Sequence, residues 1–254
     1  DNTSAMWCGV DPLWEKYAGM NPYNYCAGNP VMMVDRDGRE FDKADEEYLN
    51  AKFIPKANEL KENYQKELDG LTDESRRSVR MRNNLKERIT EIDNSLAEVE
   101  ELKKSSQKYK FDFSGQSIPK GNDETVLYGI TSYSKDDDAV LMSIRNGSGD
   151  YGTVAHELKH AYQFEKGELS FHSVQGHISY LYDITDEKQA HIRGWAFDSN
   201  NSKFADSNTY RFIANKSGFS LKNSSVRESM IKTYNISRNL EYFRYNGKTY
   251  KPNK

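Results

Sequence analysis

The sequence predicts an α+β protein, and three patterns carry this prediction. Residues 40–107 are dominated by charged side chains, and apolar residues from Leu85 to Leu102 recur every three or four positions, as on one face of a helix. Three short stretches rich in β-forming residues follow, at 110–113, 125–133 and 139–145. A glycine-rich loop at 146–150 then leads into a second helical pattern from Thr153.

Composition divides the chain into three zones, 1–39, 40–107 and 108–254. The first is rich in Gly, Pro, Asn and Tyr, which predicts short strands and turns with no long element. The second predicts an antiparallel helical hairpin, about 44–69 against about 73–105, with capping residues at 72–75. We expect this hairpin to brace the rest of the chain, with dimerisation and docking of a partner protein as the alternatives.

The third zone, 108–254, mixes strands and helices. Beyond the helix from Thr153, we expect a second helix that opens near Thr185 and continues to Phe197. Weaker signals toward the C-terminus predict a helix near 224–234 and a terminal β-hairpin around Asn246-Gly247.

Charge and composition exclude several classes of function. The 254 residues include 36 Lys and Arg against 39 Asp and Glu, a net charge of −3, with no dominant basic block, so nucleic acid is not expected as the main partner. The apolar stretches are too short to span a bilayer. Seventeen Tyr, eleven Phe and three Trp argue against wholesale disorder.

The sequence HELKH at 156–160 contains candidate metal ligands and a candidate general base. On a helix, His156 and His160 lie one turn apart on one face, so both imidazoles can bind one metal ion. Zinc lowers the pKa of a bound water to about 7, and Glu157 is placed to accept the proton of that water as general base. We therefore expect a zinc site with His156 and His160 as ligands.

A catalytic zinc ion takes a third protein ligand. The extended motif with Gly and His at the next positions is excluded, because the chain has Gln163 and Lys166 there. Glu187, near the start of the second helix and three residues before Ala190, resembles the third ligand of the gluzincin metallopeptidases. That family often has Asp four residues after this Glu, where this chain has His191.

Other side chains compete for these roles. Asp186 or His191 could take the third position instead of Glu187. His172 and His177 fall in an expected loop and are interpreted as exposed polar residues. An oxyanion could be stabilised by one of the tyrosines nearby in sequence, among which no choice is made: Tyr162, Tyr180 and Tyr182.

Residues 1–39 resemble the C-terminal end of an RHS-repeat core. The resemblance rests on DPLWEKY at 11–17, NPYNYCAGNPV at 21–31 and DRDGR at 35–39. In that family a β-cocoon shell surrounds a variable C-terminal toxin of a polymorphic toxin system. Self-cleaving members end the second box in Asp-Pro-x-Gly-Leu. Because Arg36 and Arg39 replace the Pro and the Leu, we assign no catalytic role to Asp11 or Asp35.

Together, these resemblances imply a zincin-like metallopeptidase effector over 108–254, secreted or delivered by a bacterial secretion system and acting in the target cell. The implied partners are a protein or peptide substrate, a cognate immunity protein and the RHS shell of the parent chain. Two alternatives remain: a zinc amidase acting on cell-wall peptide or another non-protein amide, and a catalytically inactive binding module.

Overall fold

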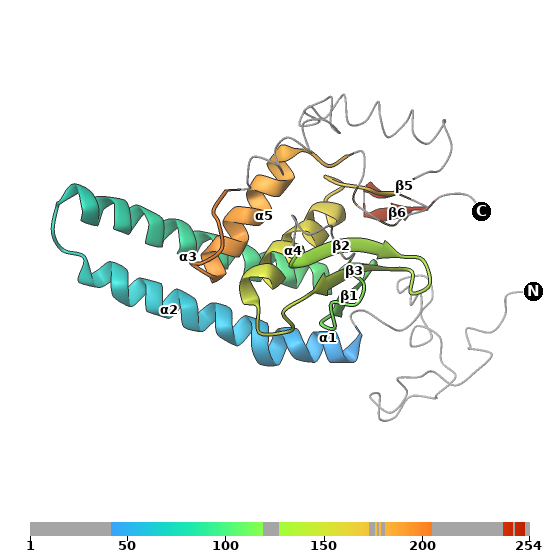
Figure 1. Cartoon of the computed structure of the whole chain (residues 1–254), viewed down its shortest axis with the longest axis horizontal. Helices are drawn as coiled ribbons and strands as arrows, with labels where there is room; N and C mark the ends of the chain where they lie inside the picture. Colours follow the sequence, from blue (N-terminus) through green and yellow to red (C-terminus); the bar gives the residue numbers. More distant parts are fainter. Residues whose placement is uncertain are drawn as a thin grey trace, which may run out of the picture. The chain divides into compact units, whose positions relative to one another are not determined.

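The computed structural model describes residues 42–118, 127–172, 176, 178, 181–204, 241–245 and 247–251. The zone expected over 1–39 and the helix expected near 224–234 lie outside these residues. The described part contains both helices and short strands, which confirms the predicted α+β class (Figure 1). None of its helices is long and apolar enough to cross a membrane.

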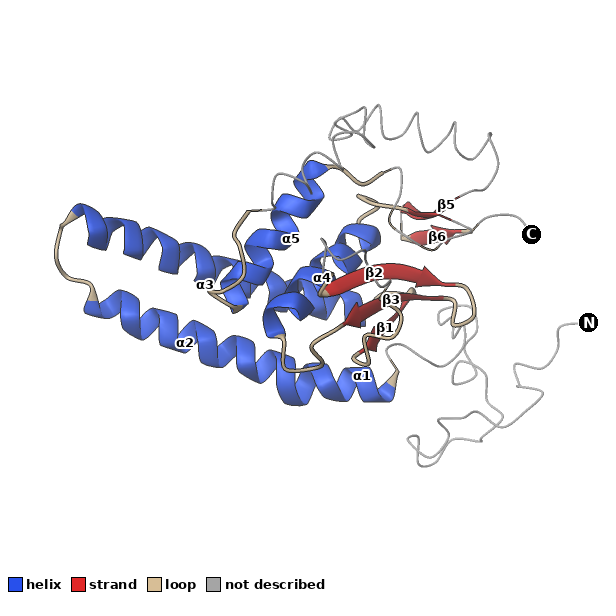
Figure 2. Cartoon of the chain, viewed as in Figure 1, coloured by secondary structure: helices blue, strands red, loops and turns tan. Residues whose placement is uncertain are grey.

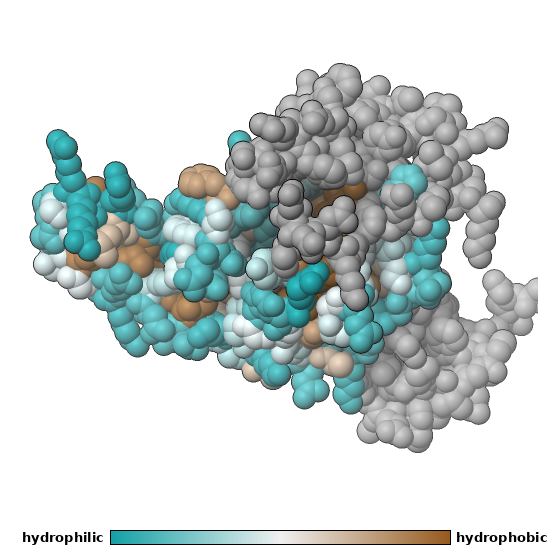
Figure 3. Space-filling view, viewed as in Figure 1, coloured by the Kyte–Doolittle hydropathy of each residue, from teal (hydrophilic) through white to brown (hydrophobic). Residues whose placement is uncertain are grey.

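The predicted helical hairpin is present. Its elements are α1 (Lys43–Tyr48), a π-helical turn (Leu49–Phe53), α2 (Ile54–Gly70) and α3 (Arg76–Lys103). The two arms are antiparallel, because Lys61 pairs with Asp93 at 2.5 Å while Arg82, near the start of α3, donates to the Leu71 carbonyl at 3.0 Å. In the space-filling view, hydrophilic residues predominate over this hairpin, with hydrophobic patches between them (Figure 3).

Local chemistry explains how the arms begin. Ser75 caps α3 by accepting a hydrogen bond from the Ser78 N–H at 3.2 Å. Pro55, in the first turn of α2, has no N–H to donate, and the wider π-helical turn lies immediately before it. The π-helical turn has no counterpart in the periodicity of the sequence.

A three-stranded sheet follows the hairpin (Figure 2). Its strands are β1 (Lys108–Asp112), β2 (Gly129–Ser134) and β3 (Ala139–Ile144), in the order β1-β3-β2. β1 is parallel to β3 and β2 is antiparallel to it, so β2 forms one edge of this sheet. These strands confirm the three β-rich stretches of the sequence.

Two helices carry the predicted functional residues: the first packs on the sheet, and the second packs on the first and on α3. They are α4 (Tyr151–Glu165) and α5 (Ile184–Phe197). A second small sheet joins β4 (Phe171–His172), β5 (Glu241–Tyr245) and β6 (Lys248–Tyr250). The expected terminal hairpin is thus confirmed, and Gly247 turns it with a φ of +71°, a conformation that favours glycine.

One hydrophobic core joins the hairpin to the sheet and to α4. The base of the hairpin contributes Leu49, Phe53 and Val99, which are all but fully buried. Phe53 stacks on Phe197 at the end of α5, with ring centroids 5.0 Å apart. The hairpin therefore braces the site-bearing helices, as the sequence predicts.

A buried ion cluster ties the same helices together. Arg193 of α5 is 2% exposed and contacts two carboxylates of α3, those of Glu91 at 3.0 Å and Glu98 at 2.6 Å. Glu98 also pairs with Lys159 of α4 at 2.8 Å. Because both charges of each buried pair need their partner, this cluster fixes how α3, α4 and α5 pack.

A buried carboxyl joins α1 to the sheet. Asp45 Oδ2 accepts a hydrogen bond from the Phe111 N–H at 3.2 Å. Burial raises the pKa of Asp45 from 3.8 to about 6. The folded protein therefore binds this proton more tightly than the unfolded chain, and the stability contributed by Asp45 is fully present below about pH 4 and is lost as the pH rises through about 6.

Asp45→Asn tests this linkage, because the amide keeps an oxygen for Phe111 but does not ionise. Between pH 4 and pH 7.5 we expect the variant to gain up to about 3 kcal/mol of unfolding free energy relative to wild type. Urea unfolding at several pH values measures this difference, with Asp42→Asn, an exposed neighbour, as the control. Parallel pH profiles for wild type and Asp45→Asn would contradict the assignment.

Candidate metal centre

Helix α4 presents the two motif histidines side by side. Asp150 caps the helix by accepting from the Thr153 N–H at 3.0 Å, which sets the helix start two residues earlier than the sequence indicates. His156 and His160 lie on one face of the helix, with their Nε2 atoms 3.1 Å apart. His160 is 3% exposed.

Helix α5 brings Glu187 to these histidines. Asp183 caps the helix in a capping box with Asp186, which places Glu187 in the first turn. Glu187 Oε1 lies 3.6 Å from His156 Nε2, and Oε2 lies 3.3 Å from His160 Nε2. The structure therefore brings the three predicted metal-binding residues together.

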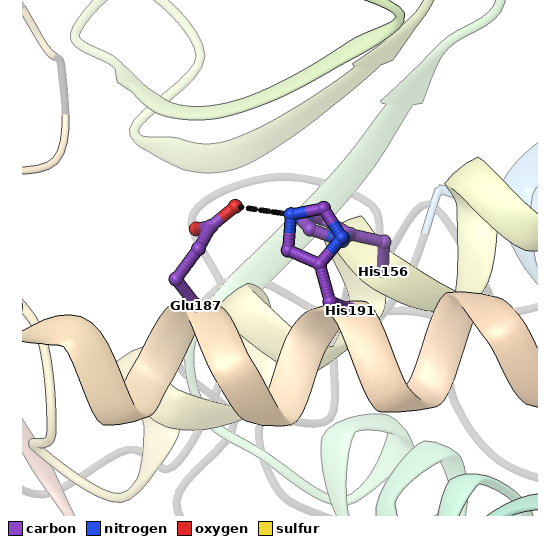
Figure 4. Close-up of side chains that lie close together, drawn as sticks. All are labelled: His156, Glu187 and His191. Carbon is purple, nitrogen blue, oxygen red and sulfur yellow. Dashed lines mark ion pairs between the residues drawn. The ribbon is translucent and has the colours of Figure 1, made fainter. Parts of the chain in front are cut away.

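A further histidine joins this cluster. His191, one helical turn after Glu187, places its Nε2 3.1 Å from Glu187 Oε1 (Figure 4). Its ring centroid lies 4.9 Å from that of His156. His156, Glu187 and His191 each offer one ligand atom within 4.8 Å of the others, so this group could hold a metal ion.

Hydrogen bonds on the outer side of the rings set the tautomers of the histidines. Gln163 donates from Nε2 to the Asp186 carbonyl at 2.9 Å, so its Oε1 faces His160 Nδ1 at 2.8 Å. His191 Nδ1 lies 3.3 Å from the Ser202 carbonyl. Because an amide or carbonyl oxygen only accepts, both Nδ1 atoms donate, and both Nε2 atoms are turned toward Glu187.

This convergence of ring nitrogens on a carboxylate requires a proton or a metal ion. A carboxylate and two imidazole nitrogens about 3 Å apart repel one another unless a proton or a metal ion lies between them. Burial lowers the pKa of His156 to about 3, which keeps that ring neutral and able to bind a metal. The donor set thus fits a metal ion.

The charge of Glu187 dominates the electrostatics of this cluster. Burial acts to raise the pKa of Glu187, but hydrogen bonds from His160 and His191 hold it well below its usual range. Burial also acts to lower the pKa of His160, whereas the hydrogen bond and charge of Glu187 outweigh it and raise that pKa to about 9. Without a metal, His160 therefore keeps a proton that a metal ion must displace.

Glu157 is held between α4 and the edge strand β2. It is 4% exposed and accepts a hydrogen bond from Thr131 Oγ1 at 2.6 Å. Burial raises the pKa of Glu157 to about 7. A Cβ atom built on Gly129 would lie 2.5 Å from Glu157 Oε1, so glycine at this position leaves room for the carboxylate.

The competing candidates fall at other places. Asp186 accepts from the Asp183 N–H at 2.8 Å and serves the helix cap, outside the metal-binding group. His172 ends β4, whereas His177 and Tyr180 lie outside the described residues. Tyr162 points to Glu101 at 3.2 Å on the surface.

Tyr182 contacts the metal-binding cluster directly. Its hydroxyl donates to Glu187 Oε2, and its ring centroid lies 5.9 Å from that of His160. Gln163 and Thr131 also support the site and have no role in the sequence prediction. Gln163 could have been found from its spacing, three residues after His160 on the same helical face.

No family model matches the chain, and the curated proteins and solved structures give no match either. The site is therefore interpreted from its own residues.

Gln163→Leu tests the outer hydrogen bond of His160. The variant removes the acceptor at Nδ1, and we expect zinc affinity to fall about 10–100-fold while the fold is kept. Competition with a chromophoric chelator measures the affinity, and circular dichroism checks the fold. Gln189→Leu, which removes a neighbour of Gln163 at 3.3 Å, is the matched control. Equal affinities in both variants would refute this positioning role.

Proposed function

We propose that this chain carries a zinc-dependent metallopeptidase of the zincin type, the effector (toxin) domain of an RHS-type polymorphic toxin. The observation that carries the proposal is the position of Glu157. A buried carboxylate with a pKa near 7 lies next to an imidazole and carboxylate cluster and next to a sheet edge.

Zinc is the metal that this donor set favours. Imidazole nitrogens and a carboxylate oxygen are typical ligands of catalytic zinc, with bonds of about 2.0–2.2 Å. Tetrahedral ligands at that length lie about 3.3 Å from one another, close to the 3.1–3.6 Å that separate Glu187 from the histidines. When bound, zinc supplies Lewis acidity and an acidified water.

Glu157 acts as the general base in this proposal. The hydrogen bond from Thr131 fixes one carboxylate oxygen, Oε2, and leaves Oε1 beside Gly129 to accept a proton. A base with a pKa near 7 can take a proton from water and then deliver it to the leaving amide nitrogen.

The edge strand β2 supports a peptide as substrate. The Arg145 N–H donates to the Tyr128 carbonyl at 2.8 Å, which makes this a hydrogen-bonded pair of the antiparallel ladder. Because such pairs alternate, Ile130 also faces β3, whereas the backbone groups of Gly129 and Thr131 point to the outer edge. An extended peptide can pair with these groups next to Glu157.

Part of that edge is already paired within the described residues. The Tyr133 N–H donates to the Gly176 carbonyl at 2.8 Å. The stretch around Gly129 and Thr131 therefore marks where a substrate strand would bind. This edge favours peptidase activity over the alternative, a zinc amidase acting on cell-wall peptide.

The biological setting of the proposal rests on residues 1–39. Their resemblance to an RHS-core end supports delivery by a bacterial secretion system into a target cell. It also supports an immunity protein and the RHS shell as partners. The net charge of −3 gives no support for nucleic acid as a partner. An inactive binding module is the remaining alternative.

The proposal is tested by incubating the zinc-loaded chain with a bacterial proteome and labelling new amino termini. We expect new termini that vanish after chelation and return when zinc is restored. Stoichiometric zinc with no new termini, but with release of peptides from purified cell wall, would favour the amidase. If the wild-type chain binds no zinc, both hydrolase functions are refuted and the inactive binding module is the remaining function.

A further inference from the structure

We propose that His191 is a fourth protein ligand of the metal, so that His156, His160, Glu187 and His191 close the site in the resting protein. This inference rests on the metal binding of the proposed function. It concerns the coordination of the metal, and its test does not require hydrolysis of any substrate.

His191 lies within the cluster formed by the predicted ligands. It lies four residues after Glu187 on α5, hence on the same helical face, and its Nε2 is 3.1 Å from Glu187 Oε1. Figure 4 shows a ring nitrogen of His191 turned toward Glu187, and the His191 ring centroid lies 4.9 Å from that of His156. The same oxygen of Glu187 lies 3.6 Å from His156 Nε2, so the His191 nitrogen belongs to one cluster with the predicted ligands.

A backbone carbonyl contacts the outer nitrogen of the His191 ring. A metal-binding histidine donates its other ring N–H to an outer acceptor such as a backbone carbonyl. His191 Nδ1 lies 3.3 Å from the Ser202 carbonyl, which can accept that hydrogen bond. Nε2 is then turned toward the Glu187 carboxylate, where a shared metal ion can take the place of a proton.

Exposure distinguishes His191 from the other ligands. Its side chain is 25% exposed, against 18% for His156, 11% for Glu187 and 4% for His160. His191 is thus the proposed ligand nearest to solvent. Its side chain could leave the metal while exposing little buried surface. Four protein ligands are typical of closed zinc sites, whereas a catalytic site keeps one position open. The His191 ring would therefore control access of water and substrate to the metal.

Coordination of the bound metal tests this inference. X-ray absorption of the zinc-loaded chain counts the imidazole ligands, and we expect three in wild type, two in His191→Ala and three in His172→Ala, the control. In the cobalt-loaded proteins, azide should shift the visible spectrum of His191→Ala at concentrations that leave wild type unchanged.

Two imidazoles in wild type, with no change in His191→Ala, would overturn the inference and leave His191 as an ion-pair partner of Glu187. The wild-type count decides the question even where the variant fails to fold. Failure of peptide hydrolysis with three imidazoles bound would refute the peptidase and leave His191 as a ligand. Absence of bound zinc would overturn both proposals.

Discussion

Glu157→Gln is expected to lower peptide turnover by about 10²–10⁴-fold while zinc stays bound, because the amide cannot accept the proton that a general base must take. The Gln side chain has the same shape and keeps an oxygen for the Thr131 hydroxyl, which lies 2.6 Å from Glu157 Oε2. The packing of α4 against β2 is therefore retained. Turnover of a peptide found in the terminus-labelling experiment measures the effect, and metal analysis confirms the zinc content.

Thr131→Val separates the base from the group that orients it. It removes the hydrogen bond to Glu157 but leaves the carboxylate, so we expect a smaller loss of turnover than in Glu157→Gln. Activity of Glu157→Gln within a few-fold of wild type would exclude Glu157 as the base. Loss of zinc from this variant would instead assign Glu157 to the metal-binding group.

Glu187→Ala is expected to lose zinc. The carboxylate of Glu187 faces all three imidazoles, at 3.1–3.6 Å. Its removal should weaken binding by more than the about 10–100-fold that follows loss of an outer hydrogen-bond partner. The pKa of His160 should also fall, since burial lowers it and the hydrogen bond and charge of Glu187 that raise it are lost. Titration with zinc and histidine NMR measure the two effects.

Asp186→Asn is the matched control for Glu187→Ala. Asp186 is the neighbouring carboxyl, and an Asn side chain can still accept from the Asp183 N–H within the capping box. We expect this variant to bind zinc as wild type does. The reverse result, with zinc kept in Glu187→Ala and lost in Asp186→Asn, would assign the third ligand to Asp186.

The sequence predicts the parts of the fold that short-range periodicity determines. The apolar spacing from Leu85 to Leu102 indicates α3, because a helix that packs on one face must repeat every three or four residues. Likewise, alternation and β-forming residues indicate the three strands of the first sheet. The spacing of His156 and His160 places both on one face of α4, since four residues make about one helical turn.

Contacts between distant segments are not visible in such patterns. Thr131 and Glu157 are 26 positions apart, and only the packing of β2 on α4 brings them together. The pairing of β4 with β5 joins residues about 70 positions apart in the chain. The sequence offers His191 as an alternative to Glu187, whereas the structure places both in one cluster, because they lie one turn apart on α5.

The four donors come in two pairs, one on α4 and one on α5. An ion bound to both pairs joins residues 160 and 187 and so closes a loop of chain, as a covalent cross-link does. The unfolded chain lacks this arrangement, so the ion binds the folded state alone. If zinc is that ion, as proposed, free zinc at a hundred times the dissociation constant would stabilise the fold by about 2.7 kcal/mol. The resistance of this protein to unfolding should consequently follow the zinc concentration of its surroundings.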